Sequence, residues 1–353
     1  MKNENAIDLM KFIMSLLIVA IHVPILTGNL NFYDSLISNG IARVGVPFYF
    51  ITGSYFLFRK IESDNARHTY KKYFLKLFRI YCIWSFIYLL PILFIAIYKD
   101  PSRVIYRIPI FIKDFLFSGL YYHLWYLNAT IVCTILFILL VGRKRYRPIL
   151  LPLSIVLYVC GLLCGAYYIV IANHTSELIW LNYLQDLISR YTYSTSFSFP
   201  LFWLIFIYLG YRLATARIYI NRYISGICLI VSIVLIYCEL FFIDSTDLCR
   251  SHSMMISIVP ASCFLFIWAK SISLPNLGGV YPFLRHLSTL IYLVHPLVWL
   301  IISSIYRYLG IVNDVSFLSY MLVLTISIFC AVLIIISSKS SNRNIQKLSL
   351  LYR

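Results

Sequence analysis

Charge is scarce in this chain, since only 12% of its 353 residues are charged and just 13 of them are acidic. A soluble protein of this length would carry about twice that proportion of charge. No polar stretch is left over that is long enough for a separate soluble domain. We therefore expect a single integral-membrane domain over residues 1–353.

The motifs of several enzyme classes are also missing. The sequence contains no glycine-rich phosphate loop, no Gly-x-Ser-x-Gly nucleophile elbow and no His/Cys cluster at metal-ligand spacing. We expect no metal and no permanently bound cofactor. Internal repeats and paired helices broken by Gly or Pro are not evident either, which counts against an inverted-repeat transporter.

Apolar residues dominate instead, at 61% of the chain. The first apolar run, Ile7–Leu26, is too long for a signal peptide and has no small-residue cleavage site, so it is read as the first span. Apolar runs of about 20 residues predict an all-α polytopic membrane protein with about ten transmembrane helices. The expected spans are approximately 7–26, 36–58, 75–97, 122–141, 148–172, 197–214, 223–243, 253–270, 286–307 and 316–337.

Basic residues outnumber acidic ones by 30 to 13, and their distribution follows the predicted topology. With the N-terminus in the cytoplasm, most lysines and arginines fall in inner loops and at the termini, as the positive-inside rule requires. Both termini are therefore predicted to be cytoplasmic in a multi-pass protein of the cytoplasmic membrane. The basicity is read as a topology signal and an attraction to anionic lipid, not as affinity for nucleic acid.

Two ionisable side chains share the first span. Lys11 and His22 are separated by about three helical turns, so both project from one helix face with a rise of roughly 16 Å between them. Ionisable groups inside a membrane are costly, and by default they indicate a functional site.

Other ionisable residues are predicted to lie at the same depth as His22. Arg43 in span two, His123 at the start of span four and Glu239 near the end of span seven all fall in the outer half. Each would cost roughly 2.5–3.5 kcal/mol at mid-bilayer, so we expect them to face one another or water. His295 precedes a proline in span nine, where the His-Pro step is expected to kink the helix and free backbone groups.

A second charged pair precedes span three. Lys76 and Arg79 are i,i+3 neighbours on one helix face, where they either hold phosphate groups or act as snorkelling interfacial anchors. The outer segment 172–199 mixes aromatic and polar residues. It is either an interfacial helix with a linker or a chain folded back over a cavity.

These segments together resemble acyltransferase family 3, a family of ten-helix membrane O-acyltransferases. The resemblance covers nearly the whole chain and rests on motifs in the family's order. They are Lys11-x10-His22, RVGVPFYFITGSYF from Arg43, Lys76-x-x-Arg79, HLWYL at 123–127 and YLVHP at 292–296. Positions 11 and 76 depart from the family, which usually has arginine there, so bidentate contacts would be lost.

The resemblance implies transfer of an acyl group, typically acetyl, from cytoplasmic acyl-CoA to a hydroxyl of an envelope carbohydrate. His22 would be the catalytic base, a role that suits an imidazole with a pKa near 6.5. Lys11, Lys76 and Arg79 would hold the CoA, and Arg43 would shape the pocket. From the residues themselves we add four candidate substrate-binding side chains: His123, Trp125, Glu239 and His295.

Two other functions remain open. YYHLWYL and the segment His252–Phe266 are similar to the membrane halves of membrane-bound serine racemases, for which handling of an amino acid has been proposed. This similarity favours a transporter or exporter of a small polar solute such as serine. The Lys-for-Arg departures also allow a family member with a scaffold or regulatory role. The acceptor, the acyl chain and the oligomeric state are not indicated by the sequence.

Overall fold

A computed structural model describes residues 4–26, 31–63, 65–101, 104–173, 179–191, 198–216, 218, 220–246, 249–311 and 316–353. Helices, turns and irregular segments account for all of these residues, which confirms the all-helical prediction for the described chain. Seven of the described segments are long and apolar enough to cross a membrane. Three shorter apolar helices, at 125–141, 200–215 and 258–271, coincide with the predicted fourth, sixth and eighth spans, the last two ending one residue later than predicted. The count of ten spans and the side of the termini stay predictions.

The chain divides into two compact units. Unit 1 comprises residues 1–49, 219–240 and 257–353, and unit 2 comprises residues 50–218 and 241–256. The chain passes from one unit to the other inside two helices, α3 (Gly45–Ser63) and α11 (Arg222–Asp244).

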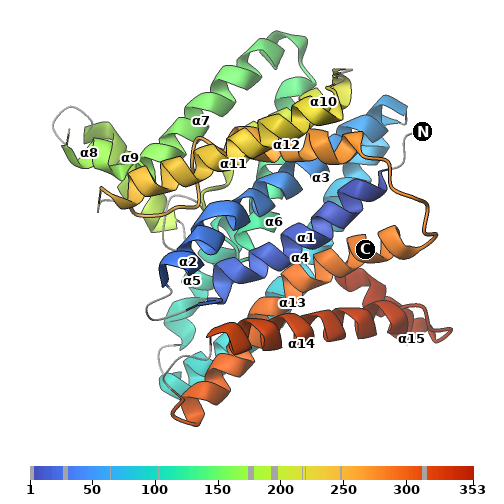
Figure 1. The fold of residues 1–353 in the computed structure, drawn as a ribbon. Coiled ribbons are helices and arrows are strands. Elements are labelled where there is room, and N and C mark those ends of the chain that lie inside the picture. The colour runs from blue at the N-terminus through green and yellow to red at the C-terminus, as the bar shows by residue number, and fades with distance from the viewer. Residues whose placement is uncertain are drawn as a thin grey trace. The chain divides into compact units, whose positions relative to one another are not determined.

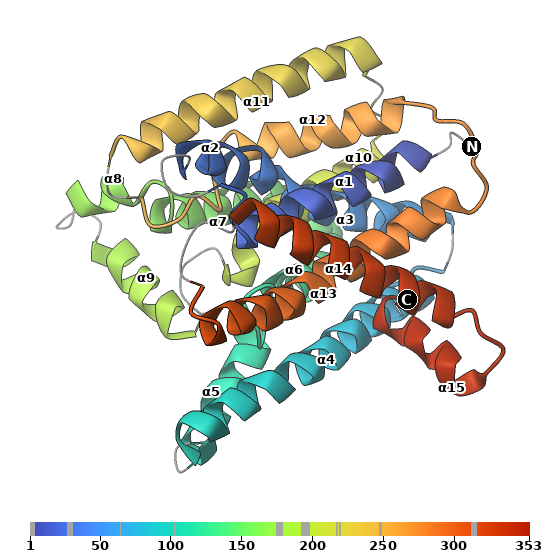
Figure 2. The same ribbon diagram turned by 60° about the horizontal axis from the view of Figure 1, so that its bottom comes forward.

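Unit 1 is built around three helices that lie side by side in Figures 1 and 2. They are α1 (Asn5–His22), α13 (Val280–Tyr308) and α14 (Ser316–Ser337). Within unit 1, α13 packs extensively on both α1 and α14. α12 (Ile258–Ser271) also packs on α1.

The segment between the first two spans is irregular. The short helix α2 (Asn31–Ser35) continues into the π-helical turn η2 (Leu36–Gly40) and the 3₁₀ turn η3 (Ile41–Val44) before α3 begins. A Cβ at Gly40 would lie 2.8 Å from the Tyr237 ring, so α11 approaches the backbone closely there. Single π-helical turns occur frequently at functional sites. The prediction of one regular helix over 36–58 is therefore corrected at its first turns.

The C-terminus folds back onto unit 1. Two short turns follow α14, α15 (Arg343–Gln346), which Figure 2 labels, and η8 (Lys347–Leu351). They lead to Tyr352, which is buried. The Tyr352 hydroxyl and the Ser338 hydroxyl are hydrogen-bonded at 2.7 Å, and the Tyr352 ring contacts the His286 ring edge-on. These contacts tie the end of the chain to α13 and α14.

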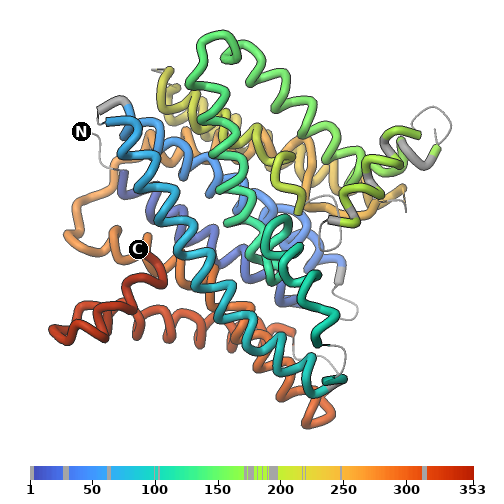
Figure 3. The backbone as a smooth tube through the Cα atoms, turned by 180° about the vertical axis from the view of Figure 1, so that it is seen from behind, coloured from blue at the N-terminus to red at the C-terminus, as the bar shows by residue number. Residues whose placement is uncertain are grey.

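Unit 2 contains the longest described helix, α4 (Ala66–Lys99), which runs as one continuous rod in Figure 3. Its 34 residues would span roughly 51 Å, more than the hydrocarbon core of a bilayer. It begins at Ala66 because the Asn65 side chain accepts hydrogen bonds from the backbone N–H groups of Arg67 and His68. The helix of the predicted third span, 75–97, thus starts nine residues earlier than predicted, at Ala66.

The other helices of unit 2 surround an aromatic core. They are α5 (Val104–Phe117), α6 (Trp125–Val141), η5 (Lys144–Ile149), α7 (Leu150–Cys164), α8 (Tyr168–Asn173), α9 (Ile179–Tyr191), η7 (Pro200–Trp203) and α10 (Leu204–Thr215). In the core the Phe50 and Trp203 rings stack at 5.6 Å, and Trp125 lies 4.9 Å from Trp203. The segment 172–199 contributes α9, while residues 174–178 and 192–197 lie outside the described chain.

Gly210 lets α10 cross α3 at backbone distance. A Cβ added there would lie 1.9 Å from the Ser54 hydroxyl oxygen and 2.5 Å from the Ile51 carbonyl oxygen. We expect Gly210→Val to lower the free energy of unfolding by at least about 2 kcal/mol, as overpacking commonly does. Gly279→Val, where nothing lies within 4 Å, is the matched control. Thermal unfolding in detergent checks the difference, and equal melting temperatures would contradict it.

Candidate functional site

His22 and His295 meet between α1 and α13 in unit 1. Their imidazole rings stack with centroids 5.5 Å apart and an interplanar angle of 23°. His295 is fully buried, whereas His22, the last residue of α1, is partly exposed. The structure therefore brings together two of the predicted site residues, which are separated by most of the sequence.

The proline after His295 explains the local geometry. Helix α13 continues through Pro296, which has no N–H to donate to the Tyr292 carbonyl one turn earlier. The His295 Nδ1 lies 2.9 Å from the Ile291 carbonyl oxygen, and the ring also interacts with the Tyr292 backbone. Nδ1–H therefore donates, and in a neutral ring Nε2 is the acceptor. The backbone groups near the His-Pro step are engaged by the histidine itself.

An ion pair fixes the other end of the same two helices. The Arg285 guanidinium donates to both Asp8 carboxylate oxygens, at 2.8 Å from Nε and 2.5 Å from Nη2. Asp8 is almost fully buried and Arg285 is half exposed. Asp8 precedes His22 and Arg285 precedes His295, so α1 and α13 run parallel. This pair is not among the predicted contacts, although a carboxylate in the first turn of an apolar span, Asp8, is a sequence signal for one.

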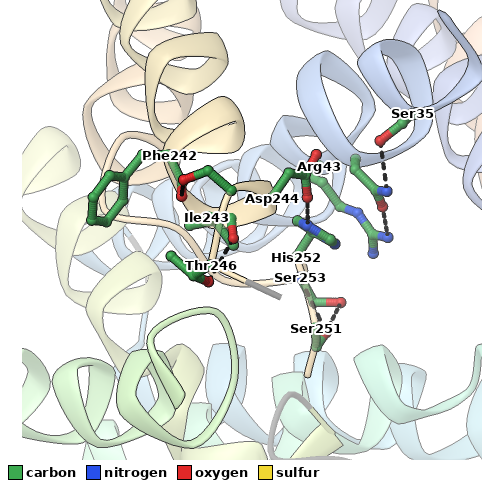
Figure 4. Close-up of polar contacts among 11 residues, drawn as sticks. Ser35, Arg43, Phe242, Ile243, Asp244, Thr246, Ser251, His252 and Ser253 are labelled. Carbon is green, nitrogen blue, oxygen red and sulfur yellow. Dashed lines mark hydrogen bonds and ion pairs between the residues drawn. The ribbon is translucent and has the colours of Figure 1, made fainter. Parts of the chain in front are cut away.

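Arg43 belongs to the same site. It lies in η3, within electrostatic range of His22. Its Nη2 donates to the Asn39 side-chain oxygen at 2.7 Å, and Asn39 donates to the Ser35 hydroxyl at 3.1 Å (Figure 4). This i, i+4 series along the irregular turns fixes the direction of the guanidinium.

Lys11 lies on the His22 face of α1, as predicted, and is partly buried. Its carbonyl oxygen accepts a hydrogen bond from the Tyr49 hydroxyl at 2.6 Å, which ties α1 to α3. On the same helix the Leu16 carbonyl accepts from Tyr320 of α14 at 3.3 Å. The backbone of α1 is therefore held from two neighbouring helices.

Glu239 has a clear structural partner in unit 1. Its Oε2 accepts hydrogen bonds from the backbone N–H of Ser257, at 2.8 Å, and from the Ser257 hydroxyl. Ser257 precedes the first residue of α12, so the carboxylate meets the positive end of that helix. Substrate binding by Glu239 stays a prediction beside this contact.

His123 and Trp125 are packed among aromatic side chains of unit 2. His123 is buried, and its ring makes edge-on contacts with Tyr88, at 4.7 Å between centroids, and with Tyr121, at 5.8 Å. Trp125 belongs to the Phe50–Trp203 cluster. These contacts account for both residues as packing groups, and their roles toward a substrate stay predictions.

Lys76 and Arg79 also belong to unit 2. Both side chains are exposed, whereas Ile80, Tyr81 and Trp84 of the same helix are buried. The pair thus lies on the exposed side of α4. The structure leaves open both interpretations, the phosphate site and the interfacial anchors.

A histidine–carboxylate pair outside the predicted site residues lies between the end of α11 and the following loop (Figure 4). His252 Nε2 is 2.6 Å from Asp244 Oδ1. Beside it, Ser251 accepts from the Ser253 backbone N–H at 3.2 Å, and the Arg250 guanidinium lies 3.5 Å from the centre of the Tyr168 ring. The sequence signal, a carboxylate eight residues before a histidine, is not specific.

The unit 1 site combines the His22–His295 imidazole pair, between α1 and α13, with the Arg43 guanidinium of η3. An imidazole can accept a proton from a hydroxyl, and a guanidinium can stabilise an oxyanion. Among the described residues, no group of three or more His, Cys, Asp or Glu side chains could hold a metal ion. The arrangement suits proton transfer beside a developing negative charge.

The long apolar helices define a polytopic helical membrane protein, and the His22–His295–Arg43 site places ionisable groups among them. The chain belongs to acyltransferase family 3, whose acyltransferase domain matches residues 4–337. This is a family of transferases that move groups other than aminoacyl groups. The family resemblance inferred from the ordered motifs is therefore confirmed.

The curated relatives that the chain matches are named as racemases, not as acyltransferases. The chain is 28% identical over 343 residues to an amino-acid racemase of Enterococcus faecalis, covering 94% of this chain and 46% of that protein. A second amino-acid racemase of the same organism is 29% identical over 272 residues, covering 75% and 36%. A serine/alanine racemase of Enterococcus gallinarum is 28% identical over 165 residues, covering 46% and 23%. The chain thus spans at most about half the length of these relatives. No solved structure matches it.

Proposed function

We propose that this protein is a membrane O-acyltransferase of the cytoplasmic membrane. It transfers an acyl group, acetyl in the simplest case, from cytoplasmic acyl-CoA to a hydroxyl of an envelope carbohydrate. The observation that carries the proposal is the His22–His295 stack with Arg43 in electrostatic range, in a chain of this family.

His22 acts as the general base in this reaction. It takes the proton of the acceptor hydroxyl as the oxygen attacks the thioester carbonyl, and Arg43 stabilises the oxyanion that forms. The carbon–sulfur bond then breaks, and the proton on His22 passes to the departing CoA thiolate. The products are the ester and free CoA, so the protonation state of His22 is restored.

Two features support this division of roles. His22 is partly exposed, as a base that meets a substrate must be, while the buried His295 orients it from behind. Lys11 lies on the same face of α1 as His22, roughly 16 Å away along the helix. An extended pantetheine arm is of comparable length, so Lys11 is placed to meet the donor.

Binding and transfer by the purified full chain test the proposal. We expect acetyl-CoA to raise the melting temperature, because a ligand that binds only the folded state stabilises it. Radiolabelled acetyl-CoA should then label envelope glycan. If millimolar CoA did not shift the melting temperature and the glycan also stayed unlabelled, the proposal would be contradicted.

The racemase relatives favour a second candidate, movement of a small polar solute such as serine across the membrane. Transporters often couple to ions through intramembrane carboxylates. In unit 1 two such carboxylates already have protein partners, Asp8 with Arg285 and Glu239 with Ser257. Serine uptake into proteoliposomes that is lost in Arg43→Ala and indifferent to acyl-CoA would favour this candidate over the transferase.

A further inference from the structure

A pocket of about 280 Å³ lies within unit 2. It is formed by the ends of α3, α6 and α10 together with the first turns of α4 and the η5 turn. The lining residues are Phe58, Ile61, Tyr70, Val141, Gly142, Arg147, Tyr211 and Thr215. In the predicted topology all of these helix ends face the cytoplasm. The pocket is therefore at the side from which a soluble donor would arrive.

The aromatic walls are held in place by the core. Phe58 and Tyr211 contact each other edge-on at 5.1 Å, and both contact the buried Phe137, at 5.3 Å and 5.2 Å between centroids. Tyr70 faces them from α4, within electrostatic range of Tyr211. A planar heteroaromatic ring stacks well on such side chains, which contribute roughly 1–3 kcal/mol per stacked base.

Arg147 supplies the positive charge of the pocket. Its Nε donates to the Val141 carbonyl oxygen at 2.9 Å, which orients the guanidinium at the end of α6. The side chain is also within electrostatic range of the Tyr70 hydroxyl. Guanidinium groups suit phosphate oxygens, because their fork matches the geometry of two acceptors.

The size of the pocket sets a limit on the ligand. It is slightly smaller than the roughly 300–1,000 Å³ of sites that enclose a whole drug-sized molecule. It fits one ring system with an attached phosphate, and the remainder of a longer ligand would extend outward. Tyr70 belongs to the buried side of α4, about half a turn around the helix from the exposed Arg79. The pocket and the Lys76–Arg79 pair are therefore different places on this helix.

We infer that this pocket, lined by Tyr70, Arg147 and Tyr211, binds the nucleotide end of the acyl donor, the base between the aromatic rings and a phosphate on Arg147. This inference rests on the proposed function, because it takes acyl-CoA as the donor. It gives the nucleotide a site other than Lys76 and Arg79.

Calorimetry on the purified full chain tests the inference with two probes, coenzyme A and adenosine 3′,5′-bisphosphate. We expect Arg147→Ala to raise the Kd of both probes at least about tenfold, since losing a hydrogen bond to a charged group weakens binding by at least about that much. Thr215→Trp, which fills the pocket and keeps Arg147, should have a similar effect. Arg145→Ala, an exposed arginine of the same loop, should bind both probes as the wild type does.

The transfer assay separates the inference from the proposed function. With acetyl-pantetheine, a donor without a nucleotide, Arg147→Ala and the wild type should transfer acetyl equally well. If the wild type binds CoA and transfers acetyl but Arg147→Ala and Thr215→Trp bind both probes normally, the inference is wrong and the function stands. If the wild type neither binds CoA nor transfers acetyl, both are wrong. If phosphatidylglycerol in nanodiscs competes with CoA at Arg147, the pocket is a lipid headgroup site and the inference is overturned.

Discussion

Replacing His22 with alanine is expected to lower the rate of acyl transfer at least about a hundredfold, because general-base catalysis contributes roughly 10²–10⁴-fold. The KM for acyl-CoA should change little, since the base acts on the acceptor hydroxyl and not on the donor's nucleotide. Steady-state kinetics with radiolabelled acetyl-CoA and a glycan acceptor measure both constants. A loss confined to kcat identifies a group that acts in the transition state.

Controls must separate the base from the ring stack, because His22→Ala also removes one face of the contact with His295. His22→Phe retains an aromatic ring but cannot accept a proton, so it should be as inactive as the alanine variant. His68→Ala removes an exposed histidine from the start of α4 and should retain full activity. Full activity in His22→Ala or in His22→Phe would show that another group is the base.

Depth in the membrane was a good guide to part of the site. His22 and Arg43 are predicted from their depth, because an ionisable side chain in an apolar span carries a free-energy cost that only function or pairing offsets. His295 is predicted from the His-Pro step in span nine. The structure brings these three together in unit 1. His123 was assigned to the same level, but it belongs to unit 2 and is surrounded by tyrosine rings. Predicted depth therefore does not indicate which side chains surround a residue within its own unit.

Pairs made by distant helices were not predictable. Asp8 and Arg285 are separated by 277 positions, and their contact depends on the register of α1 against α13. In the sequence, nothing distinguishes Arg285 from the other lysines and arginines, 30 in all. The pocket around Arg147 is unpredictable for the same reason, because residues from five separate elements form its walls. A single sequence contains no signal for such a register.

The irregular start of the second span illustrates a different limit. Hydropathy predicts one helix over 36–58, yet π-helical and 3₁₀ turns precede α3. The close approach of Tyr237 to Gly40 is a tertiary contact that hydropathy does not record. Within these turns the Arg43 guanidinium still donates to the Asn39 side-chain oxygen at 2.7 Å, an i,i+4 contact that a regular helix would also allow.

Removing Arg285 is expected to destabilise unit 1 strongly. Breaking a buried ion pair by deleting one partner costs about 3–5 kcal/mol, because the remaining charge is left without a partner. Asp8 is 3% exposed but Arg285 is 50% exposed, so we expect the lower end, about 3 kcal/mol, for Arg285→Ala. Unfolding in mixed detergent micelles, followed by circular dichroism, measures this loss.

Two further variants test whether the loss comes from the unpaired carboxylate. Arg307→Ala removes an exposed arginine from the last turn of the same helix and should leave the stability nearly unchanged. Asp8→Leu combined with Arg285→Met removes both charges and should be more stable than Arg285→Ala alone, because no buried charge remains. If the double variant were as unstable as Arg285→Ala, the loss would come from the packing of the arginine stem. If Arg285→Ala unfolded like the wild type, the pair would not be what holds α1 against α13.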